Sequence, residues 1–343
     1  MKRFCLAVAA ITVSLGVFAG PAIACGGLVG ENGTIQLVRT ATLAAYHDGV
    51  ERYVTSFEFV GDGAEVGSII PLPDVPTEVV RGGDWTLQRL TREVAPPVRE
   101  ATLAQASGDS STAAAKVILE TKIDALDITI LEGGAEAVGQ WALEHKFFLT
   151  PDAPEVLEFY AARSPIFMAA RFDASRAKAL GQRSGDGTPI MLTIPTDQPW
   201  VPLRILSLGL PKSQRVDADV FLLTDKKPDL LSGGSGLELL RSETANASLL
   251  NDLRSDKGME WVPDSMWLSY LQVATNAGSL DYDLAVSTDA KVAPARLDTG
   301  IAQPVTVDED GVARWPIVLG VVSAAVAIFL LAGWTATGRR RSS

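Results

Sequence analysis

Cysteine and histidine are both scarce in this chain of 343 residues, in which each occurs only twice. Cys5 lies in an apolar N-terminal stretch that the sequence predicts to be removed, so no disulfide can form within the processed chain. The same counts exclude structural zinc sites built from four cysteines, or from two cysteines and two histidines. The folded chain must therefore be stabilised by burial of a hydrophobic core.

The motifs that usually carry catalysis or hold cofactors are also missing from the sequence. His47 and His145 stand outside any His-Glu-x-x-His pattern, and no glycine-rich phosphate loop follows a predicted strand. The run Gly-Gly-Ser-Gly at 233–236 fails the pattern of a serine nucleophile because Leu237 follows it. We expect His47 to be an exposed turn residue and His145 to pack near a helix end. The sequence thus identifies no catalytic residue, no cofactor and no metal site.

Pairs of acidic residues are the remaining candidates for chemistry. No twelve-residue loop with a central glycine and a terminal glutamate surrounds any of them, so solvated positions are favoured over calcium sites. The pairs are Asp217 with Asp219 and Asp281 with Asp283.

The two ends of the chain predict its location. Lys2 and Arg3 precede an apolar stretch and a small-x-small site at 22–24, so residues 1–24 are predicted to be a secretory signal peptide. Near the other end, the twenty uncharged residues 315–334 are long enough to cross a bilayer. We predict a single-pass protein of the cell membrane with its N-terminal domain outside.

The flanks of the C-terminal run support this orientation. Trp315 and Trp334 bracket it where interfacial aromatics are expected, and Arg339, Arg340 and Arg341 follow in the tail. By the positive-inside rule, the tail 335–343 is cytoplasmic, and the helix anchors the chain in the membrane.

The predicted exported part is strongly acidic. Without the six basic residues of the two terminal segments, 24 basic residues remain against 41 acidic ones, a formal charge of −17. Such a surface repels nucleic acid and favours cations or basic partners, although plain solubility is the simpler and favoured reason for it.

Hydrophobic periodicity predicts both strands and helices in the exported part. Strands of period two joined by a His-Asp-Gly turn at 47–49 indicate a β-hairpin. Strands and helices alternate too irregularly for a doubly wound sheet, so we predict a mixed α+β fold with largely antiparallel sheets and flanking helices, plus one C-terminal transmembrane helix. The expected strands are 34–46, 50–60, 65–72, 126–131, 166–172, 189–195, 201–208, 218–223 and 267–275, and the expected helices are 85–94, 135–147, 153–162 and 237–253.

Composition divides the chain further. We expect an exported domain at 25–286, with a polar insertion near 98–116 as a possible boundary between two halves. Residues 287–314 lack aromatic residues and contain prolines and an acidic run, so they are predicted to form a flexible stalk.

An ordered set of short motifs resembles the bacterial family known as domain of unknown function 2330. The likeness covers residues 25 to about 225 and implies an exported, often membrane-anchored bacterial protein with no established activity. Members often have a second cysteine shortly after the first, where this chain has Val29 and Gly30, so a disulfide at that place is in doubt. The motifs are Cys25-Gly26-Gly27, Ile70-Pro71-Leu72-Pro73, residues 127–131, Trp141 with Ala142-Leu143-Glu144, Tyr160, and residues 199–204.

Cys25 follows the predicted cleavage site directly, which leaves two routes open. Lipoprotein processing would attach a diacylglycerol to its sulfur, whereas ordinary cleavage would leave a free thiol able to form an intermolecular disulfide. Ala22 stands where lipoprotein signals usually carry leucine, which favours the second route.

The sequence favours binding or assembly in the bacterial cell envelope over catalysis, with envelope proteins or glycans as partners. The alternative is a hydrolase of envelope polymers that uses a carboxylate pair, such as Glu155 with Glu158 or Asp281 with Asp283. Trp200, Trp261, Trp267 and Tyr270 are candidates for a sugar- or peptide-binding groove, although core packing is the commoner role of such residues.

Overall fold

The computed structural model describes residues 27–30, 40–57, 66–95, 117–182, 187–289 and 291–300. The predicted signal peptide, Cys25, the insertion at 98–116, Trp315, Trp334 and the three arginines at 339–341 lie outside these residues. Within them, no helix is long and apolar enough to cross a membrane.

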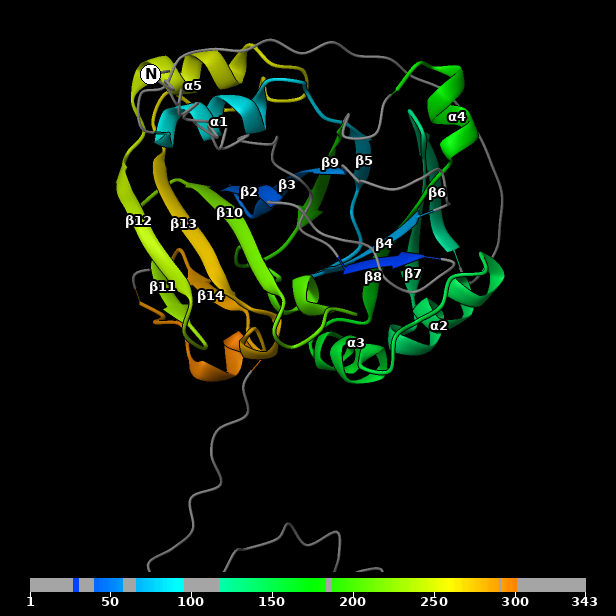
Figure 1. Ribbon diagram of the computed structural model, residues 1–343. Helices are drawn as coiled ribbons and strands as arrows, with labels where there is room; N and C mark the ends of the chain where they lie inside the picture. The colour runs from blue at the N-terminus through cyan, green and yellow to red at the C-terminus, as the bar shows by residue number, and fades with distance from the viewer. Residues whose placement is uncertain are drawn as a thin grey trace, which may run out of the picture. The chain divides into compact units, whose positions relative to one another are not determined.

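A seven-stranded sheet forms one half of the fold (Figure 1). Its neighbouring strands are antiparallel except for β2 and β10, which run parallel. In sheet order the strands are β12 (Leu237–Thr244), β13 (Trp267–Asn276), β10 (Arg215–Thr224), β2 (Thr40–His47), β3 (Val50–Phe57), β9 (Thr188–Pro195) and β5 (Glu78–Arg81).

A five-stranded antiparallel sheet and a two-stranded one complete the β structure. Both larger sheets combine strands from before and after the segment 98–116, so this segment does not divide the described fold into two halves. The larger sheet contains β1 (Gly27–Gly30), β4 (Val66–Leu72), β8 (Ile166–Phe172), β7 (Leu126–Glu132) and β6 (Val117–Ile123), and the smaller one contains β11 (Asp229–Ser232) and β14 (Leu284–Ser287).

The helices are short and lie outside the sheets. Helices α1 and α5 pack together against the seven-stranded sheet, and α2 and α3 pack together against the five-stranded sheet (Figure 1). The helices of the described residues are α1 (Thr86–Val94), α2 (Gly134–Glu144), α3 (Ala153–Ala161), α4 (Ala174–Ala179) and α5 (Ala247–Arg254). Short 3₁₀ turns lie at Arg204–Ser207, Ala277–Ser279 and Arg296–Thr299.

The core follows from the alternation of side chains along the strands. Tyr53 and Leu192 of the seven-stranded sheet pack against Ile70 and Met168 of the five-stranded sheet, so the two sheets share an apolar layer. Further along the first sheet, Val220 and its neighbours pack instead on the two-stranded sheet and on the segment after Val201. The predicted mixed α+β class with largely antiparallel sheets is confirmed.

The predicted hairpin is also confirmed. Strands β2 and β3 are antiparallel, and His47 pairs with Val50 across the turn. Asp48 and Gly49 both have positive φ, of 50° and 75°, as a two-residue turn matching the strand twist requires.

The predicted helix at 237–253 is wrong over its first half. Residues Leu237–Thr244 form the edge strand β12, which pairs with β13 and contains an irregularity between Leu239 and Arg241. The helix starts only after Asn246, whose side chain accepts a hydrogen bond from the backbone N–H of Leu249. The leucines of this segment fit both periods, so pairing with β13 determined the outcome.

The predicted strand at 201–208 is also wrong. Val201 makes a single bridge to Leu284, and the chain then turns into a 3₁₀ helix. The cause is Asp283, whose carboxylate accepts hydrogen bonds from the backbone N–H groups of Leu203 and Arg204 and so removes these donors from any sheet.

The first part of the predicted stalk packs on the domain. Ser287 ends β14, and the carbonyl of Thr299 accepts a hydrogen bond from the N–H of Asp283. Thr299 is fully buried. The folded unit therefore continues through residue 300, and the rest of the predicted stalk lies outside the described residues.

Candidate functional site

A cleft of about 730 Å³ opens beside strand β14. Residues from several parts of the chain line it: Gly49 in the β2–β3 turn, Pro73 and Asp74, Arg163, the segment from Pro195 to Val201, Asp283 with the whole of β14, and the loop containing Val292, Pro294 and Asp298. A cleft of this size lies in the range of small-molecule and peptide sites.

Prolines explain why the segment beside β14 leaves a cleft. Pro195 and Pro199 have no N–H to donate, so the chain between them cannot continue a ladder with β14. It is held instead at a few points, where Thr196 N–H donates to the carbonyl of Gly49 and Thr288 N–H donates to Oε1 of Gln198.

Asp283 anchors the inner end of the cleft. Its Oδ1 accepts hydrogen bonds from Tyr160 Oη at 2.8 Å, Leu203 N at 2.7 Å and Arg204 N at 3.0 Å, and its Oδ2 pairs with the guanidinium of Arg163. The carboxylate is almost completely buried. Burial, followed by the charge of Asp283, raises the pKa of Tyr160 well above its ordinary value, so this phenol stays protonated as a donor.

Arg163 is held on an aromatic surface. Its guanidinium carbon lies 4.6 Å from the ring centroid of Phe159 and 4.8 Å from that of Trp200. Because Asp283 already balances its charge, Arg163 contributes little net positive charge to the cleft.

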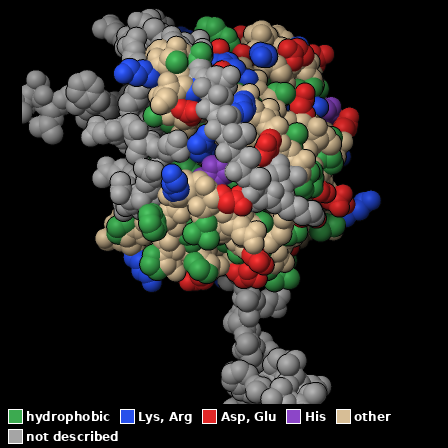
Figure 2. Space-filling view, turned by 90° about the vertical axis from the view of Figure 1, so that its right-hand side faces the viewer, with side chains coloured by type: hydrophobic (Ala, Val, Ile, Leu, Met, Phe, Trp, Pro, Cys, Tyr) green, Lys and Arg blue, Asp and Glu red, His purple; other side chains and the backbone are tan. Residues whose placement is uncertain are grey.

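The remaining ionisable side chains at the cleft are acidic. Asp74, Asp197 and Asp298 line it and are exposed, and Arg163 is the only basic residue among the described residues that line it. Acidic and basic side chains are interspersed on the face shown in Figure 2, whereas at the cleft the acids predominate. The cleft therefore favours positively charged ligands.

The buried acid Glu51 supports the cleft at Trp200, which is one of the residues that line it. Its Oε2 accepts a hydrogen bond of 2.9 Å from the N–H of Trp200, and Oε1 has no hydrogen-bond partner among the described residues. Burial raises the pKa of Glu51 to about 8, and the bond from Trp200 offsets only part of this effect. Glu51 is therefore predominantly neutral at pH 7.

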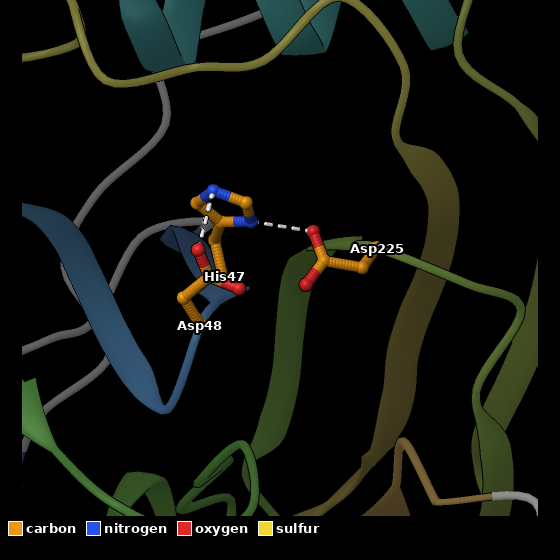
Figure 3. Close-up of side chains that lie close together, drawn as sticks. All are labelled: His47, Asp48 and Asp225. Atoms are coloured by element: carbon orange, nitrogen blue, oxygen red, sulfur yellow. Dashed lines mark hydrogen bonds and ion pairs between the residues drawn. The ribbon is translucent and has the colours of Figure 1, made fainter.

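A second group of ionisable side chains lies at the β2–β3 turn, which borders the cleft (Figure 3). Nδ1 of His47 lies 2.6 Å from Oδ1 of Asp225, and Nε2 lies 3.4 Å from Oδ2 of Asp48. The ring of Trp261 stacks at 6.1 Å from the ring of His47. The sequence predicted His47 as a turn residue, but gave no sign of Asp225.

The other histidine has a packing role, as expected. Nδ1 of His145 lies 2.8 Å from the carbonyl oxygen of Trp141, and the two rings are 4.7 Å apart. His145 follows the last residue of α2, so it closes the end of that helix.

Neither of the carboxylate pairs suggested for catalysis has both of its members in the cleft. Glu155 and Glu158 are exposed on α3, where Glu155 pairs with Arg204. Asp281 is exposed, whereas Asp283 is buried in the network described above.

The pair in strand β10 is also separated. Asp217 pairs with Arg215 at the surface, whereas Asp219 is buried and accepts a hydrogen bond of 2.6 Å from the hydroxyl of Tyr270. Of the four aromatic residues proposed for a groove, Trp200 lines the cleft, and Tyr270 packs on Phe221 in the core.

Comparison with known proteins identifies a family but no activity. A family model described as an uncharacterized protein conserved in bacteria, DUF2330, matches residues 19–227. No curated protein matches the chain.

Solved structures give only distant likenesses. Baculovirus P35 is 10% identical, with 71% of this chain and 92% of that chain covered and a TM-score of 0.38. A mutated baculovirus P35 after caspase cleavage is 8% identical, with coverage of 73% and 98% and a TM-score of 0.34. At these TM-scores neither likeness carries an argument about this chain.

Proposed function

This chain belongs to the bacterial family DUF2330, and we propose that it is a binding module of the cell envelope that receives a basic peptide segment of a partner protein in its acidic cleft. The predicted signal peptide and the predicted span at 315–334 would hold this module outside the cytoplasm.

The charge of the cleft carries the proposal. Three exposed carboxylates, those of Asp74, Asp197 and Asp298, line a cavity in which Arg163 is already paired with Asp283. A ligand with lysine or arginine side chains would meet an excess of negative charge, which favours association and suppresses acidic partners.

The shape of the cleft favours an extended chain as ligand. All four residues of β14 line it, together with Trp200 and with Val201, which forms a bridge to Leu284 at the start of this strand. Apolar contacts along a strand combined with charges at the rim suit a peptide of alternating apolar and basic residues.

The hydrolase alternative has weaker support. Of the two pairs considered for it, only Asp283 reaches the cleft, and its oxygens are occupied by Tyr160, Arg163 and two backbone N–H groups. A general acid or base needs an oxygen within reach of its substrate.

Binding of a labelled lysine–valine repeat peptide to the full-length protein tests the proposal by fluorescence anisotropy. Replacing both Asp197 and Asp298 by Asn should weaken binding by about twofold to thirtyfold, because each exposed charge pair contributes about 0.2–1 kcal/mol. Asp264→Asn is the matched control, because Asp264 is 98% exposed and pairs with Arg254 away from the cleft lining.

A glutamate–valine repeat peptide of the same length serves as the ligand control. Equal binding of the two peptides, or equal weakening by Asp264→Asn and by the cleft variant, would show that the cleft does not select basic chains.

A further inference from the structure

The pairing of β2 with β10 brings His47 and Asp225 together. These strands are parallel, and their last paired residues are Tyr46 and Thr224. His47 and Asp225 come directly after this pair, so they lie side by side where the two strands end. Carboxyl ends of adjacent parallel strands commonly hold ligand-binding side chains.

Side-chain alternation directs both residues to the same face. Leu43 and Ala45 of β2 and Phe221 and Leu223 of β10 belong to the apolar cluster that packs under α1 and α5. His47 continues the first row and Asp225 the second, each at a spacing of two residues. His47 and Asp225 therefore lie next to each other at the edge of this apolar cluster, each at the end of a row of apolar side chains.

Asp48 adds a third ligand atom from the turn itself. The ligand atoms of His47, Asp48 and Asp225 all lie within 4.8 Å of one another. The side chains are 28%, 85% and 39% exposed, so solvent reaches the group and water can complete a coordination shell.

From this geometry we propose that His47, Asp48 and Asp225 bind one divalent transition-metal ion, for which Zn²⁺ is the suitable probe. An imidazole and two carboxylates match the donor types that zinc accepts, in a site with an open position. Ca²⁺ and Mg²⁺ prefer sites made only of oxygen ligands, so the histidine should select against them.

The two carboxylates contact different nitrogens of the ring, which limits how an ion can bind (Figure 3). The ion takes Nδ1, the nitrogen beside Asp225, and Nε2, once Asp48 has turned to the ion, donates its hydrogen to water, a usual partner of metal-bound histidines. Asp48 is largely exposed and can rotate toward the ion at little cost.

The neighbouring residues hold the ring of His47 in place. Trp261 stacks on it, and the guanidinium of Arg52 lies 4.2 Å from the centroid of Trp261. The inference is independent of the proposed peptide ligand, although Gly49 of the same turn lines the cleft.

Isothermal titration of the full-length protein with ZnCl₂ tests this site. Every protein carries Cys5→Ser and Cys25→Ser, because a thiolate would bind zinc by itself. We expect one site whose affinity falls at least tenfold in His47→Ala and in Asp225→Asn, and no competition by Mg²⁺ or Ca²⁺. His145→Ala is the matched control, because it removes the other histidine of the chain, and zinc affinity should stay unchanged.

The histidine ring signals in NMR spectra give a second measurement. Zinc should shift the signals of His47 and leave those of His145 in place, and Asp225→Asn, which preserves side-chain size, covers the case in which His47→Ala does not fold. Absence of zinc binding by the parent protein at 100-fold molar excess, or binding unchanged in both His47→Ala and Asp225→Asn, would overturn the proposal.

Discussion

Buried ionisable residues hold the cleft from inside the protein. Asp283 pairs with Arg163 and accepts hydrogen bonds from Tyr160 and two backbone N–H groups, so its position is fixed by four partners. Glu51 has a single donor, Trp200 N–H, and its pKa is raised to about 8 by burial. Asp283 therefore supports the cleft through an ion pair and several donors, whereas Glu51 supports it as a neutral acid with one donor.

Glu51 should make the stability of the protein depend on pH. The folded state keeps its proton up to about pH 8, whereas the unfolded state loses it above about pH 4.5. The contribution of Glu51 to the free energy of unfolding is therefore fully present below pH 4.5. It declines by about 1.4 kcal/mol per pH unit as the pH rises toward 8. Glu51→Gln does not titrate, so its free energy of unfolding should exceed that of the parent by a margin that grows over this window.

Urea unfolding at pH 4.5 and at pH 8 measures this margin. Glu238→Gln, at an exposed position of β12, is the control and should give no such trend. A difference between Glu51→Gln and the parent that stays constant with pH would contradict the buried neutral acid.

At the scale of elements, the start of helix α1 is fixed by a side chain that is far from it in the sequence. Asp84 stands just before α1, where a capping residue is common, but its carboxylate pairs with Arg81. Asp256 takes this role: its Oδ2 accepts hydrogen bonds from the N–H groups of Trp85 and Thr86. A carboxylate at a helix N-terminus also interacts favourably with the helix dipole. The loop after α5 thus fixes the start of α1.

The two glycines before α1 provide a matched test of this contact. A Cβ atom on Gly83 would lie 2.1 Å from the carboxyl group of Asp256, whereas one on Gly82 would have its nearest neighbour at 3.5 Å. Gly83→Ala should therefore lower the free energy of unfolding by about 1–3 kcal/mol, because Asp256 must leave α1. Gly82→Ala should change it by less than about 0.5 kcal/mol.

Thermal unfolding monitored by circular dichroism measures both variants. Equal stability of Gly83→Ala and Gly82→Ala would show that the contact with Asp256 does not support the helix.

At the scale of the whole molecule, one folded unit extends through residue 300, and the predicted anchor follows at 315–334. With the predicted topology, the folded unit would be on the outer side of the membrane. A cleft on such a domain would meet envelope proteins rather than cytoplasmic ones.

The predicted topology can be tested in spheroplasts of cells that make the protein with an epitope tag after Ser343. External protease should digest the N-terminal domain and leave a small tagged fragment containing Arg339, Arg340 and Arg341, because these residues are cytoplasmic in the prediction. Lysis with detergent should remove this protection. A domain that resists protease in spheroplasts and is digested only after lysis would contradict the orientation.

Local signals in the sequence determined the hairpin at 47–49, most strands, the short helices and the mixed α+β class, because side-chain period and turn residues act over a few neighbours. The predictions at the chain ends also rest on local composition. At 237–244, however, the same leucines fit a helix or a strand, and only pairing with β13 decided between them.

The sites were decided by tertiary structure alone. His47 and Asp225 are 178 positions apart, and Tyr160 and Asp283 are 123 apart, so no local pattern connects them. Their contacts depend on which strands lie side by side, and that order minimises exposed apolar surface over the whole domain. The packing that pairs β2 with β10 also removes Glu51 from water, and this burial raises the pKa of Glu51.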